Sequence, residues 1–207
     1  MIWLLLGLLI FFGIHFVPIL TSLRAQLASS IGAVGYQAVF SIISLVGFVL
    51  IVMGYGEMQT AGSGNPQIWL PPTWIKHVVF LLMLPVFVFL IAAYVPSNIR
   101  DRVKHPMLIA IKIWALAHLL ANGDLASIIM FGSFLAYAVI DRISVKSRVS
   151  RGPLGERKGT IVGDVVAVVG GLGVYLLFMF WAHEQLIGIA LSFQSLISSE
   201  ASSSTGL

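Results

Sequence analysis

The sequence predicts an all-α fold, a polytopic transmembrane bundle of about six helices. Three observations predict it, and the first two are that 58% of the 207 residues are hydrophobic and only 10% are charged. Because a soluble domain carries about 25% charged residues, this chain lacks the polar surface that a water-soluble globule needs. The third observation is that long apolar runs alternate with short polar connections, as in helical membrane proteins.

The first three expected spans are apolar runs bounded by turn residues or charges. Residues 1–23 form the first span, since they lack the basic start and the cleavage site of a signal peptide. Residues 34–55 form the second span, and a loop rich in Gly and Pro follows it. Residues 74–95 form the third span, in which we expect Pro85 to cause a kink.

The last three spans follow a charged connection over residues 96–106. Residues 106–121 and 125–140 are expected to form the fourth and fifth spans, separated by the turn Asn122-Gly123-Asp124, whose aspartate can cap the fifth helix. The sixth span starts near Ile161, and its apolar run to Phe193 is too long for one upright helix. We expect one integral membrane domain over residues 1–194 and a disordered Ser-rich tail over residues 195–207.

The positive charges predict the orientation in the membrane. Ten of the twelve Lys and Arg residues follow the first, third or fifth span, namely Arg24, Arg100, Arg102, Lys104, Arg142, Lys146, Arg148, Arg151, Arg157 and Lys158. The positive-inside rule places these connections in the cytoplasm and both termini outside. Trp3, Trp69, Trp74 and Trp181 fall near the opposite face, as in an aromatic belt. The net charge of +4 therefore indicates membrane anchoring and not nucleic acid binding.

Two histidines are candidate metal ligands inside the apolar slab. His15 lies nine residues before Arg24, and His118 lies fourteen residues after Lys104, so both reach the inner half of the slab. Two neutral imidazoles from different helices can bind one haem iron from both faces of the ring. The alternative is that each histidine only makes a hydrogen bond to a neighbouring helix. His77 and His183, nearer the outer edge, are alternatives for either ligand.

Three further basic residues are candidates near such a cofactor. Lys112 lies on a different face of its helix from His118. It either extends toward water or a carboxylate such as Asp141 or Asp164, or neutralises a haem propionate. Arg24 either anchors the first span or pairs with a propionate, and His105 lies at the cytoplasmic edge. The chain has no cysteine, which excludes disulfides, iron–sulfur clusters and thiolate ligands.

Two motifs resemble the NnrU family of bacterial membrane proteins. They are KHPMLIAIKIWALAHLLANGD at residues 104–124 and GIHFVPILTSLR at residues 13–24. That family is similar to 15-cis-zeta-carotene isomerase, an integral membrane enzyme with haem b that isomerises a carotenoid double bond without net redox change. The resemblance implies that His15 and His118 are iron ligands, that His105 is a further matched position, and that a carotenoid or another apolar lipid is the substrate. This chain departs from the plant enzyme in having no cysteine to act as an alternative ligand.

Three functions remain open at this stage. The first is haem b binding with an isomerase-like activity. The second is a non-enzymatic accessory role in denitrification, in the assembly of a nitrite or nitric oxide reductase or in electron supply to it. The third is a membrane methyltransferase, which the His-Pro dipeptide suggests but the absence of a Glu-Glu pair disfavours. Small residues in the sixth span also permit a homo-oligomer.

Overall fold

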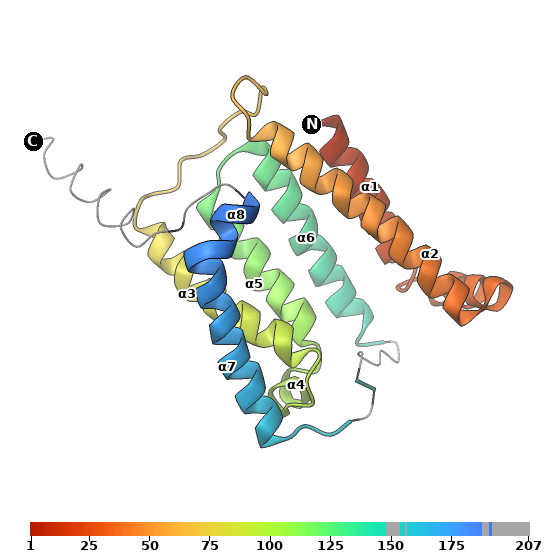
Figure 1. The fold of residues 1–207 in the computed structure, drawn as a ribbon. Coiled ribbons are helices and arrows are strands. Elements are labelled where there is room, and N and C mark those ends of the chain that lie inside the picture. The colour runs from red at the N-terminus through yellow and green to blue at the C-terminus, as the bar shows by residue number, and fades with distance from the viewer. Residues whose placement is uncertain (148–153, 156, 188–190, 192–207) are drawn as a thin grey trace, which may run out of the picture. The chain divides into compact units, whose positions relative to one another are not determined.

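The computed structural model of the protein describes residues 1–147, 154–155, 157–187 and 191, and Figure 1 shows its helices. In the part of the chain that the structure describes, four helices are long and apolar enough to cross a membrane, and two more apolar helices have 15 and 16 residues. This confirms the predicted all-α membrane fold. The expected tail, residues 195–207, lies outside the described residues. The chain divides into two compact units, Met1–Leu70 with Asn122–Val149, and Pro71–Ala121 with Ser150–Leu207.

The first unit contains α1 (Ile2–Phe16), α2 (Thr21–Met58) and α6 (Leu125–Ser144). The prediction that the first span continues to Leu23 is wrong, because α1 ends at Phe16 and the chain turns before Thr21. The physical reason is Pro18, which has no N–H to donate to the carbonyl of Ile14 and cannot continue the helix. The fifth span is confirmed, although α6 extends four residues beyond the predicted end.

A single break divides α2 into a polar part and an apolar part. Gly32 has φ 75° and ψ 161°, a conformation that residues other than glycine rarely adopt, and helical backbone lies on both sides of it. The apolar part, residues 33–58, corresponds to the predicted second span. Residues 24–31 were predicted to connect two spans but form a helix instead, because Leu20, Leu23, Leu27 and Ile31 follow one another at helical spacing.

Helices α1 and α2 pack closely through glycines. A Cβ atom added at Gly47 would lie 2.7 Å from the backbone nitrogen of Phe11, and one added at Gly54 would lie 2.7 Å from the Cα atom of Leu4. Backbones approach this closely in membrane bundles where small residues line the contact, since dispersion forces and not hydrophobicity hold the helices together. The contacts at these glycines thus determine at which position along α2 the helix α1 packs.

The turn before α6 is a tightly hydrogen-bonded cap. Asp124 Oδ1 accepts hydrogen bonds from the backbone N–H of Ser127 at 2.9 Å and from Asn65 Nδ2 at 2.7 Å. The carbonyl of Gly123 accepts the backbone N–H of Ile68 at 2.7 Å. These bonds confirm the predicted turn and the predicted cap. They also attach the loop after α2 to the start of α6.

The second unit contains α3 (Ile75–Ala92), α5 (Pro106–Ala121) and α7 (Ile161–Leu177), and α3 packs against both of the others. The fourth span has the predicted bounds, and Pro85 lies inside α3 as expected. After α7 the chain continues through a π-helical turn, η1 (Phe178–Ala182), into α8 (His183–Ile187). This continuous helical run accounts for the long apolar stretch of the sixth span up to residue 187.

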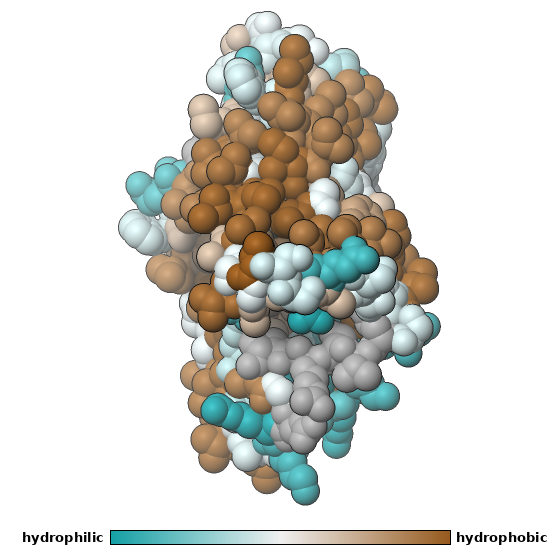
Figure 2. Space-filling view, turned by 90° about the vertical axis from the view of Figure 1, so that its right-hand side faces the viewer, coloured by the Kyte–Doolittle hydropathy of each residue, from teal (hydrophilic) through white to brown (hydrophobic). Residues whose placement is uncertain are grey.

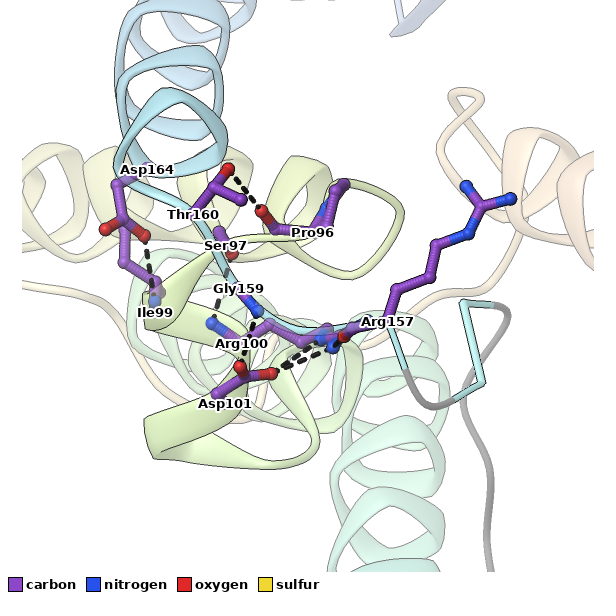
Figure 3. A network of polar contacts seen from close by, with 9 residues as sticks. All are labelled: Pro96, Ser97, Ile99, Arg100, Asp101, Arg157, Gly159, Thr160 and Asp164. Atoms are coloured by element: carbon purple, nitrogen blue, oxygen red, sulfur yellow. Dashed lines mark hydrogen bonds and ion pairs between the residues drawn. The ribbon is translucent and has the colours of Figure 1, made fainter.

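The charged connection after α3 is not a simple loop, because it folds into the short helix α4 (Asn98–Val103), shown in Figure 3. Ser97 caps α4 by accepting the backbone N–H of Arg100 at 3.1 Å. Asp164 of α7 accepts the N–H of Ile99 at 2.9 Å and Asn98 Nδ2 at 2.8 Å. Both oxygens of the Asp164 carboxylate are therefore bound to α4, and the two interpretations of Lys112 stay predictions.

Apolar side chains cover much of the helical surface. Figure 2 shows a broad hydrophobic area on the side of the molecule where α2 lies. Along the apolar part of α2 the large exposed apolar residues are Val34, Val39, Ile42, Leu45, Val46, Phe48, Val49, Val52 and Met53. Exposed apolar surface of this extent is incompatible with contact with water and suits contact with lipid.

Within each unit, most of the described Lys and Arg residues lie at the end opposite Trp3 or Trp74, the exceptions being Lys76 in the first turn of α3 and Lys112 in α5. In the first unit, Trp3 is near the end of α2, where the N-terminal ammonium contacts Met58 Sδ at 2.9 Å. Arg24 follows the end of α1, and Arg142 lies in the last turn of α6. In the second unit, Trp74 precedes α3, whereas α4 and the residues before α7 carry the basic side chains. A separation of this kind is typical of helical membrane proteins, and the orientation of the chain stays a prediction.

Candidate functional site

His15 lies in the last turn of α1, among aromatic rings of the first unit. Its ring stacks on Phe11, with centroids 4.0 Å apart and an interplanar angle of 25°. Phe40 of α2 lies 5.1 Å away and Tyr137 of α6 lies 5.8 Å away, measured between ring centroids. Three helices therefore surround one half-buried imidazole with apolar surface. The Tyr137 hydroxyl also donates to the backbone carbonyl of His15 at 3.2 Å.

The hydrogen bond of His15 determines which ring nitrogen can bind a metal. Nδ1 lies 2.6 Å from the carbonyl oxygen of Phe11, one helical turn earlier. Since a carbonyl can only accept, Nδ1 carries the proton and Nε2 carries the lone pair. A backbone carbonyl on one nitrogen is a common way for proteins to fix the tautomer and the orientation of a metal-binding histidine. His15 thus has the protonation state of a ligand through Nε2.

His118 has the same arrangement in the second unit. It lies in the last turn of α5, and its Nδ1 donates to the carbonyl oxygen of Trp114 at 2.8 Å, again one turn earlier. The Trp114 ring lies 5.2 Å from the imidazole, measured between centroids. Trp114 and His118 therefore lie on one face of α5. Nε2 of His118 is the nitrogen that carries the lone pair.

Comparison with known families decides what this chain is. The family model described as NnrU protein matches residues 3–191, which is nearly the whole chain. The chain belongs to the NnrU family. The comparison with curated proteins and the comparison with solved structures each gave no significant match. Both candidate histidines of this NnrU protein lie within the matched region.

The other candidate residues of this NnrU protein lie elsewhere. Arg24 is exposed on the polar helical part of α2, in the same unit as His15. Lys112 is half-buried on α5, six residues before His118. His105 precedes Pro106 at the start of α5, and the helix from Pro106 to His118 is about 18 Å long. His105 and His118 therefore lie at opposite ends of α5.

His183 lies in the same unit as His118. It follows the π-helical turn and is half-buried, while its neighbours Trp181 and Glu184 are exposed. The two imidazoles are close enough to interact electrostatically. A π-helical turn rotates the residues that follow it relative to a regular helix, and such turns are frequent at functional sites. The remaining candidate, His77, is exposed near the start of α3.

The sequence analysis did not predict which residues of α2 lie around His15. Phe40 contacts the His15 ring, and Tyr36 lies one turn earlier on α2, with its ring 6.2 Å from that of Phe40. Apolar and aromatic residues are common in every span, so their composition gave no signal. Only the pairing of α1 with α2 brings these particular side chains to the histidine.

A hollow elsewhere in the first unit is polar and distinct from the surroundings of His15. It has a volume of about 670 Å³ and is lined by residues 58–67 and Asp124, at the end of the unit where α2 ends. Burial raises the pKa of the Asp124 carboxyl, but its hydrogen bonds from Ser127, Asn65 and Gln59 together hold that pKa below the ordinary value. Because the carboxylate is already fully engaged in capping α6, we assign this hollow no function.

Proposed function

We propose that this NnrU protein is a haem b-binding integral membrane protein, in which Nε2 of His15 and Nε2 of His118 would bind the iron. The observation that carries the proposal is the shared geometry of the two histidines. Each donates its Nδ1 proton to the carbonyl of the residue four positions earlier, at 2.6 Å and 2.8 Å. That bond fixes the tautomer and the orientation of each neutral imidazole and raises the basicity of Nε2 as a ligand.

The surroundings of each histidine suit a porphyrin. Phe11, Phe40 and Tyr137 surround His15, and Trp114 lies beside His118, so flat apolar side chains are available to contact the ring system. Within the described residues no group of three or more His, Asp or Glu side chains could hold a bare metal ion. A prosthetic group that brings its own four nitrogen ligands needs only two from the protein.

The basic candidates have separate proposed roles. Arg24 is on the same unit as His15 and is the only basic residue among residues 1–58, so it is our candidate for pairing with a propionate. Lys112 is half-buried near the middle of α5 and is a second candidate for that role. His105 cannot bind the same iron as His118, because the two side chains lie at opposite ends of α5.

We also propose that the basic end of each unit faces the cytoplasm of a bacterial inner membrane, with both termini in the periplasm. Because the chain has no cysteine, a single introduced cysteine is the only residue of the protein that a maleimide labels. A Thr60→Cys variant should react with a membrane-impermeant maleimide in intact cells, and a Ser147→Cys variant should react only after lysis. The opposite labelling pattern would overturn the orientation.

When bound, haem iron supplies a redox-active centre that can exchange an axial ligand. Isomerisation of a carotenoid-like polyene and an accessory role in denitrification both remain predictions from the family resemblance. The experiment that tests the proposed function is the absorption spectrum of protein purified from cells supplied with a haem precursor. We expect a Soret band and about one haem per chain by the pyridine haemochrome assay. A purified, folded protein with no Soret band would overturn the proposal.

A further inference from the structure

Two buried hydroxyl groups on α2 have no hydrogen-bond partner. Within the described residues these are Tyr36 Oη and Ser44 Oγ. They lie eight residues apart on one side of the helix, and Phe40 lies between them. The Phe40 ring is 6.2 Å from the Tyr36 ring and 5.1 Å from the His15 ring, measured between centroids. Both orphan hydroxyls therefore flank the side chain that packs on the candidate iron ligand.

An unsatisfied hydroxyl inside a membrane protein requires an explanation, since hydrocarbon offers no water to replace the missing partner. Ser44 has a simple one. Rotation about its Cα–Cβ bond would let it donate to the carbonyl four residues earlier, as Ser133 does to Ile129 at 2.7 Å. Tyr36 has no such solution, because its hydroxyl is at the far end of a rigid ring and cannot reach the carbonyls of its own helix.

The other tyrosines show that the fold normally satisfies this group. The Tyr55 hydroxyl is bonded to Ser127 Oγ at 2.9 Å, and those of Tyr137 and Tyr175 donate to backbone carbonyls at 3.2 Å. Apart from Tyr36, the remaining tyrosine is Tyr94, which is 59% exposed. Among the five tyrosines of the chain, only Tyr36 has a buried hydroxyl without a partner.

We propose that the Tyr36 hydroxyl donates a hydrogen bond to a carboxylate of the cofactor bound at His15, that is, to a haem propionate. This inference rests on the proposed function. The propionates are the only charged groups of haem b, and a carboxylate in hydrocarbon is so costly that it lies toward the polar edge of the membrane. Tyr36 lies on that side of Phe40, one turn after the break at Gly32 and near the polar helical part that carries Arg24.

The chemistry of the donor agrees with that assignment. A hydrogen bond from a neutral hydroxyl to a carboxylate is charge-assisted, and is about twice as strong as one between neutral groups. A purely apolar ligand such as a polyene has no acceptor for the phenol. The carboxylate of a bound cofactor therefore explains why a buried donor is retained on an otherwise apolar helical face.

The test compares Tyr36→Phe with two matched variants. Ser44→Ala removes the other orphan hydroxyl from the same face, and Tyr94→Phe removes an exposed tyrosine hydroxyl. The rate at which each holoprotein loses haem to excess apomyoglobin is measured by absorbance. We expect about tenfold faster loss from Tyr36→Phe, as for a charge-assisted hydrogen bond, and rates equal to wild type for both controls.

The cofactor-free protein gives a second readout with the opposite sign. Without haem the Tyr36 hydroxyl has nothing to bond, so Tyr36→Phe should melt at the same temperature as wild type or above it. Reconstitution with haem dimethyl ester should reduce the difference in haem loss between Tyr36→Phe and wild type, because the ester is not charged.

The outcomes separate the two proposals. If wild type binds haem and Tyr36→Phe releases it as slowly as wild type, the role of Tyr36 is overturned and the proposed function stands. If Ser44→Ala and Tyr36→Phe accelerate haem loss equally, the effect is one of packing and the inference is likewise wrong. If wild type binds no haem, the proposed function and this inference both fail.

Discussion

Replacing Gly47 with alanine should weaken both the packing of α1 and the position of His15. The added Cβ atom would lie 2.7 Å from the Phe11 nitrogen and 2.9 Å from its Cα atom, whereas ordinary contacts begin at 3.4 Å. Since the obstacle is backbone, α1 must move away by about 0.7 Å, the difference between 3.4 Å and 2.7 Å. Overpacking of this kind costs about 1–3 kcal/mol.

The same displacement reaches the candidate ligand, because the carbonyl of Phe11 accepts the Nδ1 proton of His15 at 2.6 Å. Gly47→Ala should therefore lower the melting temperature of the detergent-solubilised protein by about 2–4 °C for each kcal/mol lost. It should also reduce the haem content of the purified protein.

The matched control is Gly13→Ala, also in a packed pair of helices but with open space around the added Cβ atom. Alanine is the better helix former, so this variant should be unchanged or more stable by up to about 1 kcal/mol. If Gly47→Ala melts like wild type while Gly13→Ala behaves as expected, the close approach of α1 and α2 is wrong.

Three further predictions concern the caps and contacts of the two units. Asp124→Ala should lower the free energy of unfolding by about 2–3 kcal/mol, through the lost cap and the buried donors left unpaired. Because the folded pKa of Asp124 is lowered, its stabilisation is present above the ordinary carboxyl pKa and is lost as pH falls through the folded value. The difference between wild type and the variant should shrink in acid, and a constant difference would refute this. Gly171→Ala should lower the free energy of unfolding by about 1–3 kcal/mol, because the added Cβ atom would meet the backbone of Val88. Gly173→Ala should cost nothing, because there is open space around its Cβ atom. Equal melting temperatures of the two variants would contradict the packing of α7. Thr160→Val should cost about 1 kcal/mol by removing the cap on the N–H of Gly163, and an unchanged melting temperature would show that the cap is unimportant.

Much of the fold could be predicted from the sequence because membrane helices follow strong one-dimensional rules. The bounds of α5 were predicted correctly, since Pro106 marks a helix start and the turn Asn122-Gly123-Asp124 marks an end. The early end of α1 was missed although Pro18 gave a signal, because the apolar run continued past it. The helix α4 was missed because its residues are charged and because it is stabilised by a hydrogen bond to Asp164, which is distant in the sequence.

The candidate site could be predicted only in part. Histidines are rare in apolar segments, so His15 and His118 were found from composition and position alone. Their tautomers follow from hydrogen bonds to carbonyls four residues earlier, which helical geometry explains but sequence did not reveal. The role of Tyr36 depends on which hydroxyls find partners, and that is a property of the folded chain.

The measurement that tests the central claim most directly is the electron paramagnetic resonance spectrum of the oxidised protein beside His15→Ala and His118→Ala. Two axial imidazoles make ferric haem low-spin, whereas loss of one favours the high-spin state. We expect a low-spin spectrum for wild type and a high-spin or haem-free spectrum for each variant. A low-spin spectrum that persists in either variant would show that another side chain is the ligand and would contradict the proposed pair.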